Sequence, residues 1–380
     1  MTELAAAGAL APATADADAG TAKVLSVRQL AWRKFRKNRL AVFGLVVLAL
    51  MYLSAAFAGF LAPYGDRETH AQFARVGPHG LNLVDTEGQF HLTPFVYGLE
   101  RTMDRKTFKQ VLTVDTEKRY ELRWLVKGAP YTLLGFIKSD VHLFGVEGDG
   151  KLFLLGTDSK GRDLFSRILY GAQVSLTVGL VGVALSLFIG ISVGLITGYY
   201  GGWFDEIVQR IIEMTLAFPQ IPLWLALAAL VPPTWNSIQI YFAISLVLSI
   251  LSWGALARQV RAMVLSLKTS DFVRAAKYAN ASTGRIMFKH LLPGTMSHVL
   301  VVATLTIPAM ILGETALSFL GLGIKPPMTS WGLLLNEAQS VQVILELPWL
   351  LFPAVFVVLT IISFNFVGDG LRDAADPFSR

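Results

Sequence analysis

Long apolar stretches dominate the chain, and most charged residues lie between them. Six stretches approach the roughly 20 residues that are needed to cross the hydrocarbon core of a bilayer. They cover residues 40–62, 174–199, 211–231, 238–257, 295–312 and 347–367. The third is the weakest candidate because it contains Glu213, Pro219 and Pro222. The pattern predicts an all-α polytopic membrane protein with six transmembrane helices.

Residues 63–165, between the first two apolar stretches, are polar and rich in charge. Within them, residues 119–126 alternate partly between apolar and polar side chains, as a half-buried strand does. Residues 142–146 and 151–155 flank Glu147-Gly148-Asp149-Gly150, a pattern that predicts a β-hairpin. We therefore expect a small β-containing insert on the external face. Four histidines lie here, His70, His79, His91 and His142, at spacings that match no metal site.

The positions of the basic residues predict the orientation in the membrane. Residues 23–39 hold seven lysines and arginines and no acid, and residues 258–294 hold seven with one acid, Asp271. Basic residues mark the cytoplasmic side. Six crossings then place both termini in the cytoplasm and the insert outside the cell membrane. The first stretch is too long for the apolar core of a secretory signal, which has about 7–15 residues.

The same reasoning divides the chain into five parts. We expect a disordered tail at 1–22, a basic segment with the first span at 23–62 and the external insert at 63–165. A membrane core follows at 166–370, with a cytoplasmic loop at 258–293, and a cytoplasmic tail at 371–380.

Composition narrows the function. Only 16% of the residues are charged and 53% are hydrophobic, whereas soluble domains carry about 25% charged residues. The absence of cysteine excludes thiolate chemistry and cysteine-ligated metals. The net charge of +6 is explained by the membrane orientation and not by nucleic acid. Residues 145–151 imitate a phosphate-binding loop, but Leu152 stands where Ser or Thr is required, so we expect no bound ATP or other cofactor.

Two features inside the apolar stretches are candidates for packing and function. Gly190, Gly194 and Gly198 lie four residues apart, a spacing that lets helices approach closely in lipid. Close packing within the membrane core is the favoured use, and a homodimer face the alternative. Glu213 and Glu314 are ionisable residues at membrane depth, which makes them candidates for lining or gating a pathway. The alternatives are an ion pair with Arg210 for Glu213 and a structural hydrogen-bond role for Glu314.

Several motifs together carry a family resemblance. They are the glycine-, aspartate- and arginine-rich run at 156–172, the basic segment at 272–293, and the shorter runs at 313–323, 330–332 and 368–373. From about residue 28 to its end, the chain resembles the C-type permease subunits of dipeptide and oligopeptide ABC importers. The resemblance implies a complex in the inner membrane of a bacterial cell, formed with a homologous second permease, one or two cytoplasmic ATPases and an external substrate-binding protein, and surrounded by membrane lipid.

Within this resemblance, the 272–293 segment is similar to the EAA loop that couples permease to ATPase. The matching positions are Phe272, Arg274, Ala275, Ala276, Asn280, Gly284 and Pro293. Arg274 replaces the family's glutamate and Asn280 its glycine; asparagine also tolerates a left-handed turn. Alternatives are the same architecture importing oligosaccharides, opines or metal complexes, an ion-coupled secondary transporter, or a membrane enzyme or receptor that uses the insert. No repeat or catalytic constellation supports the last two.

Overall fold

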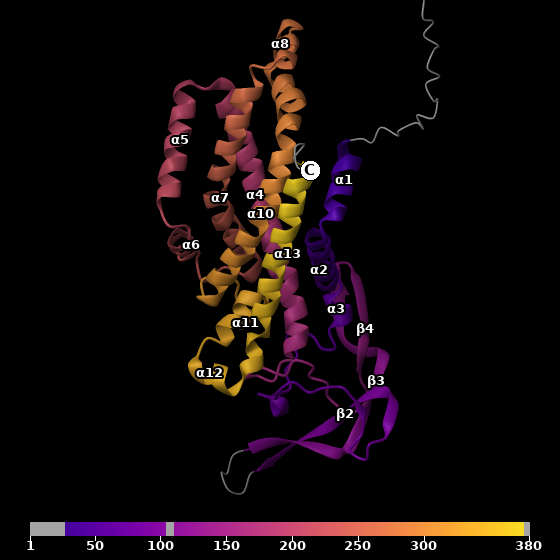
Figure 1. Cartoon of the computed structure of the whole chain (residues 1–380). Helices are drawn as coiled ribbons and strands as arrows, with labels where there is room; N and C mark the ends of the chain where they lie inside the picture. Colours follow the sequence, from indigo (N-terminus) through magenta and orange to yellow (C-terminus); the bar gives the residue numbers. More distant parts are fainter. Residues whose placement is uncertain (1–26, 104–109, 376–380) are drawn as a thin grey trace, which may run out of the picture.

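A computed structural model describes residues 27–103 and 110–375, which form an elongated bundle of helices with a small sheet at one end (Figure 1). The predicted tail at 1–22 lies outside the described residues. The main helices are α1 (Val27–Lys37), α2 (Arg39–Ala56), α3 (Ala58–Leu61), α4 (Leu164–Tyr200), α5 (Gly202–Ala217), α6 (Gln220–Ala228), α7 (Ser237–Leu267), α8 (Asp271–Tyr278), α9 (Thr283–Arg285), α10 (Leu292–Phe319), α11 (Trp331–Glu337), α12 (Val341–Glu346) and α13 (Phe352–Ala375).

The number of candidate spans is five or six within the described part of the chain. Five helical segments are long and apolar enough to cross a membrane: α2, α4, α7, the run from α9 to α10, and the run into α13. The predicted third span is instead two helices, α5 and α6, which meet at an angle of 94°. Pro219, the residue before α6, has an extended backbone and cannot continue the hydrogen-bond ladder of α5. The sequence showed both prolines but not the size of the bend.

Several helices extend beyond the apolar stretches that predicted them. α4 begins at Leu164, because the carboxylate of Asp163 accepts a hydrogen bond from the Ser166 backbone N–H at 2.7 Å and so caps the helix. α7 continues to Leu267, into the predicted cytoplasmic loop. α13 continues to Ala375, so half of the predicted tail at 371–380 is helical. Hydropathy detects the hydrocarbon-spanning part of a helix and not the polar turns that project from the membrane.

α4 and α7 pack closely along a row of glycines. A Cβ atom added at Gly190 would lie 3.0 Å from the Trp253 carbonyl oxygen, and one at Gly194 would lie 2.6 Å from that of Ala257. At Gly198 it would lie 2.8 Å from Cβ of Val264. The three glycines therefore lie at a contact between helices of the same chain.

The insert is a four-stranded antiparallel sheet in the order β1 (Asn82–Val84), β2 (Phe90–Met103), β3 (Gln110–Leu133) and β4 (Ile137–Val146). The predicted strand at 119–126 lies within β3, as expected. The predicted hairpin at 142–155 is wrong, because β4 pairs with β3, while residues 151–155 form no strand. Leu152 and Phe153 are fully buried instead. The apolar run that suggested a strand is the buried connection between sheet and bundle.

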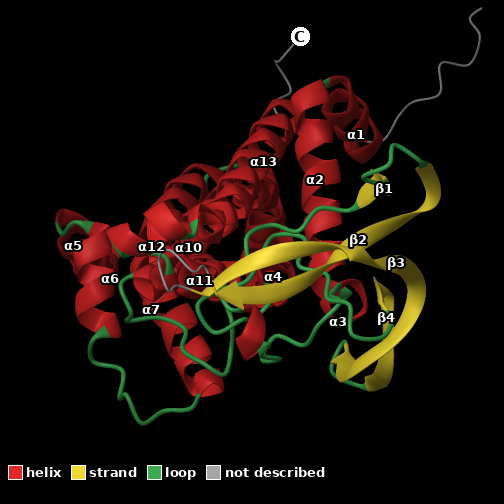
Figure 2. Cartoon of the chain, turned by 90° about the horizontal axis from the view of Figure 1, so that it is seen from below, coloured by secondary structure: helices red, strands yellow, loops and turns green. Residues whose placement is uncertain are grey.

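The bundle has two distinct ends (Figure 1). One end carries α1, α8 and the end of α13, and the opposite end carries α11, α12 and the sheet. Viewed from the latter end, the strands lie beside α2 and α3 and across the end of the bundle (Figure 2). The segment that resembles a coupling loop and the insert are therefore separated by the length of the bundle.

Candidate functional site

The segment between α7 and α10 packs against the bundle through one fully buried side chain, that of Val273. α8 is amphipathic, and its Val273 is fully buried in a cluster with Val260 and Val264 of α7 and Leu291. Ala276, one turn later, is half-buried and packs on the same cluster. Because these contacts involve the helices themselves, we expect α8 to move together with the membrane helices.

The connection from α8 to α10 turns at Asn280 and then stays helical. Asn280 has φ of 58°, the left-handed conformation that asparagine tolerates better than other residues with a side chain. Residues Ile286–Leu291 form a π-helix that leads directly into α10, and Pro293 lies in the first turn of α10. Gly284 is exposed, and a Cβ atom there would meet nothing within 4 Å, so no close contact requires glycine at this position.

The solvent side of this segment combines aromatic and basic residues. Phe272 is 47% exposed, Tyr278 89% and Phe288 65%. Around them lie four exposed basic residues, Arg274, Lys277, Arg285 and Lys289. We call these seven residues the basic–aromatic face. Ala275 is exposed among them, where its small side chain lets another surface approach the backbone.

Polar contacts fix this end of the bundle. The Lys268 ammonium group donates to the Gly198 carbonyl oxygen at 3.1 Å, and the Lys277 ammonium group lies 5.5 Å from the centre of the Tyr199 ring. Arg261 of α7 forms a two-bond ion pair with Asp205 of α5, with both distances 2.5 Å. The ends of α4, α5 and α7 are thereby joined beneath α8.

The two glutamates that were candidates for a pathway lie in different surroundings. Glu213 is on α5, exposed, and pairs with Arg210 at 2.9 Å. Glu314 is fully buried in α10 and accepts hydrogen bonds from Ser175 Oγ at 3.0 Å and Ser318 Oγ at 2.7 Å. These serines in turn accept from the backbone N–H groups of Trp331 and Ile324. Glu314 thus joins α4, α10 and the start of α11 inside the subunit, an arrangement that favours the structural role.

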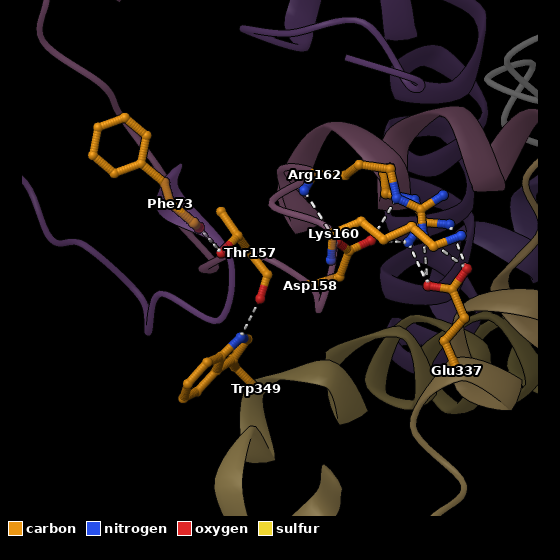
Figure 3. A network of polar contacts seen from close by, with 8 residues as sticks. Phe73, Thr157, Asp158, Lys160, Arg162, Glu337 and Trp349 are labelled. Atoms are coloured by element: carbon orange, nitrogen blue, oxygen red, sulfur yellow. Dashed lines mark hydrogen bonds and ion pairs between the residues drawn. The ribbon is translucent and has the colours of Figure 1, made fainter. Parts of the chain in front are cut away.

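A second polar cluster lies at the insert end, where the 156–172 run enters α4 (Figure 3). Arg167 is 1% exposed; its guanidinium donates to Asp158 at 2.7 Å and to Glu337 of α11 at 2.6 and 3.0 Å. Arg162 donates to Asp158 at 2.6 Å and to Glu337 at 3.0 and 3.1 Å. We call these four residues the elbow cluster. Although burial raises the pKa of Glu337, the two arginines outweigh it and lower that pKa below its ordinary range.

The same run ties the insert to the bundle. Thr157 Oγ donates to the Phe73 carbonyl oxygen at 2.6 Å and accepts from the Val76 backbone N–H at 2.9 Å. The Trp349 indole N–H donates to the Thr157 carbonyl oxygen at 3.0 Å (Figure 3). The run is therefore a junction of three chain segments.

Burial raises the pKa of Asp163, the residue that caps α4, to about 7.

Sequence reasoning recognised the 156–172 run but missed its partners. Glu337 and Trp349 lie 170 and 192 residues away from Arg167 and Thr157, the residues they bind, and no spacing rule joins them. Ser175 and Ser318 lie in apolar stretches, where a single serine does not by itself indicate a functional site. Serines are nevertheless suitable hydrogen-bond partners for a glutamate at membrane depth. Among the described residues, no group of three or more His, Cys, Asp or Glu side chains is placed to hold a metal ion.

These features define a polytopic membrane subunit: apolar helices, a structured segment with an exposed face at one end, and a rigid junction with a small insert at the other. Residues 190–380 match the family model described as binding-protein-dependent transport system inner membrane component. Residues 26–78 match the N-terminal TM domain of oligopeptide transport permease C.

Individual relatives agree with the family models. The chain is 33% identical to the dipeptide transport system permease protein DppC of Bacillus subtilis over 367 residues, covering 96% of this chain and 90% of the relative. It is 32% identical to the oligopeptide transport system permease protein OppC of the same organism, covering 96% of both chains. It is 42% identical to the glutathione transport system permease protein GsiD of Pectobacterium atrosepticum, covering 61% of this chain and 74% of the relative.

The chain belongs to the family of binding-protein-dependent transport system inner membrane components. It is a multi-pass membrane permease subunit and not an enzyme, since its relatives are transport permeases.

Proposed function

We propose that this chain is one of two permease subunits in an ATP-driven importer of dipeptides or short oligopeptides. The names of the relatives, which transport dipeptides, oligopeptides and glutathione, support the substrate class. The observation that carries the coupling mechanism is the basic–aromatic face, presented by α8 and the turns that follow it, with Val273 of α8 buried among the membrane helices. Importers of oligosaccharides, opines or metal complexes are the alternative with the same architecture.

The mechanism that we propose uses α8 as a lever. A cytoplasmic ATPase docks on the basic–aromatic face, centred on Phe272, Arg274 and Ala275. When ATP binding closes the two ATPases, α8 follows, and the packing of Val273 and Ala276 passes the movement to α4, α7 and α10. The pathway between this subunit and a second, homologous permease then changes its access from outside to inside. An external binding protein delivers the peptide.

In this proposal the bent pair α5–α6 serves as the third of six spans. Both termini and α8 then lie in the cytoplasm, and the insert lies outside. The basic residues of α1 and of the 258–294 segment support this orientation. Figure 1 shows α1, α8 and the end of α13 at the same end of the bundle, as an even number of spans requires.

The chain has no cysteine, so single cysteines report orientation without background. In intact spheroplasts, an impermeant maleimide is expected to label the variant Thr116→Cys in β3 and to leave Asn280→Cys unlabelled. After permeabilisation both should be labelled, because both positions are exposed. Labelling of Asn280→Cys alone in intact spheroplasts would show that the orientation is the reverse of the proposed one.

The experiment that tests the importer proposal is purification of the tagged chain from its own host in a mild detergent. Mass spectrometry is expected to identify a second permease and an ATPase among the co-purified proteins. After reconstitution with the binding protein, labelled dipeptide should enter vesicles only when ATP is supplied on the ATPase side. Recovery of the chain alone, monodisperse and active with an ion gradient, would refute the proposal in favour of a secondary transporter.

A further inference from the structure

The turn between β3 and β4 exposes apolar side chains at its tip. Leu134 is 54% exposed, Phe136 73% and Ile137 46%, and Leu133 beside them is half-buried. We call residues 133–137 the hairpin tip. An exposed apolar group of this kind normally marks contact with a partner or with lipid.

The backbone conformation of the tip disfavours a large side chain such as that of Leu134. Leu134 and Gly135 have φ of 51° and 83°, and the Phe136 N–H donates to the Leu133 carbonyl oxygen at 3.2 Å. Residues 134–136 form the loop between the paired residues Leu133 and Ile137, and a β-turn with positive φ at both central positions favours Asn-Gly or Asp-Gly. A leucine in the left-handed region is disfavoured by about 1–2 kcal/mol. The chain therefore carries a large apolar side chain where the backbone itself favours a small polar one.

The contacts of the hairpin show where the tip points. The ring of His142 contacts the Ala62 carbonyl oxygen, and the ring of Tyr131 packs on Gly59, three residues earlier in the chain. Residues of β3 that are nearer to the tip therefore lie beside earlier residues of α3, closer to α2. Figure 1 shows β3 and β4 running beside α3 in that direction.

Simple distances then place the tip at membrane depth. A strand rises about 3.3 Å per residue, so Leu134 lies roughly 10 Å beyond Tyr131. In the same hairpin, the step from His142 to Ser139, the partner of Tyr131, matches the step from Ala62 to Gly59, three residues of strand to three of helix. The strands are therefore inclined to the helix, and the tip reaches back to about the level of Ala56. α2 begins at Arg39 and is an apolar candidate span. A span needs about 20 residues, so the hydrocarbon layer ends close to Gly59 and the tip lies inside it.

The neighbouring helix α2 also exposes apolar side chains. Leu50, Leu53 and Phe57 are 62%, 55% and 40% exposed near the same end of α2. Lys138, directly after the tip, is exposed, and its long side chain can carry the ammonium group to the headgroup level while the tip stays in the apolar layer. α2 thus exposes apolar side chains at about the same depth as the tip.

We infer that the hairpin tip inserts into the lipid leaflet on the insert's side of the membrane. The occupant of this surface is the acyl-chain region of the bilayer. The inserted tip holds the external sheet beside α2 as a second attachment, distant from the elbow cluster. This inference does not depend on the transported substrate.

Spin labels on single cysteines test the inference with the full chain in lipid nanodiscs. At Phe136→Cys, collisions with oxygen, which concentrates in the acyl-chain region, should exceed collisions with a water-soluble nickel chelate. The matched control is Leu92→Cys in β2, which is 90% exposed and belongs to the other hairpin; there the nickel chelate should dominate. Labels at positions 134 and 136 should lie deeper than one at Lys138→Cys.

Two outcomes would overturn the inference. Dominant nickel collisions at position 136 would show that the tip lies in water. An immobilised label at 136 that neither reagent reaches would show that another protein covers the tip. Correct folding is checked with the Leu92→Cys label, whose spectrum should be the same in a second variant that also carries Phe136→Ser.

Discussion

Replacing Ala275 with arginine is expected to abolish ATP-driven uptake while the chain remains in the membrane. Ala275 is exposed between Phe272 and Tyr278, on the solvent side of α8, and makes no contribution to the buried cluster beneath. An arginine side chain there would hold a docking ATPase several ångströms away from the backbone of α8. The interface would lose its fit and add another positive charge to a face that is already basic.

Uptake of a labelled dipeptide into cells and the amount of chain in isolated membranes are the two measurements. We expect a loss of uptake of at least tenfold with an unchanged amount of membrane protein. Ala275→Ser is the matched control, because its side chain stays small and uncharged, and it should retain uptake. Co-purified ATPase should fall with Ala275→Arg and not with Ala275→Ser. Normal uptake with Ala275→Arg would exclude α8 as the docking element.

Ala276 gives a different expectation from its neighbour. It is half-buried and packs on the cluster that contains Val273 and Leu291. A large substitution there would push α8 off the bundle and so damage the subunit itself. Sequence alone treats the two alanines as equivalent; only the direction in which each points separates docking from attachment.

The apolar pattern could predict the helices because lipid demands long, continuous apolar segments. It could not predict the bend at Pro219, because one bent span and two short helices have the same composition. It also misread residues 151–155, where burial of Leu152 and Phe153 beneath the sheet produces the same apolar run as a strand. Local rules succeeded where the cause is local: the left-handed backbone of Asn280 follows from its own chemistry.

The polar clusters at the insert end illustrate the opposite case. Their partners are distant in sequence and chemically ordinary, so only the fold brings Arg167 to Glu337 and Ser175 to Glu314. Both clusters join α4 to the segment around α11. One end of the bundle is thus held by buried ionic and hydrogen-bonded contacts, while the other end presents the basic–aromatic face. Under the proposed coupling, a subunit built in this way can transmit force from α8 without losing the geometry of its opposite end.

The second large effect is expected from Glu337→Gln, which should strongly destabilise the chain. Glu337 accepts hydrogen bonds from both Arg162 and Arg167, and Arg167 is almost fully buried. Without the carboxylate, Asp158 is the one ion-pair partner that both arginines keep among the described residues, and excess positive charge stays buried. Breaking a buried pair from one side costs about 3–5 kcal/mol. Unfolding of the full chain in a denaturing-detergent titration measures the difference in free energy.

Glu346→Gln is the matched control in a neighbouring helix. Its partner Arg75 lies 3.5 Å away, and the two side chains are 47% and 58% exposed. Solvent-exposed pairs contribute about 0–1 kcal/mol, so this variant should unfold close to the parent chain. Equal stability of the Glu337→Gln and Glu346→Gln variants would show that the elbow cluster does not stabilise the fold.

The dependence on pH distinguishes the lost charge from a packing defect. The arginines lower the pKa of folded Glu337 below its ordinary value of 4.5, despite the opposing effect of burial. A carboxylate with a lowered folded-state pKa contributes stability that is complete above the unfolded-state pKa and is lost as pH falls through the folded-state value. The difference in the free energy of unfolding between the parent chain and the Glu337→Gln variant should therefore be constant from pH 5 to pH 8 and should become smaller below about pH 4.5. A gap that is the same at pH 4 and at pH 7 would assign the destabilisation to packing and not to the ion pairs.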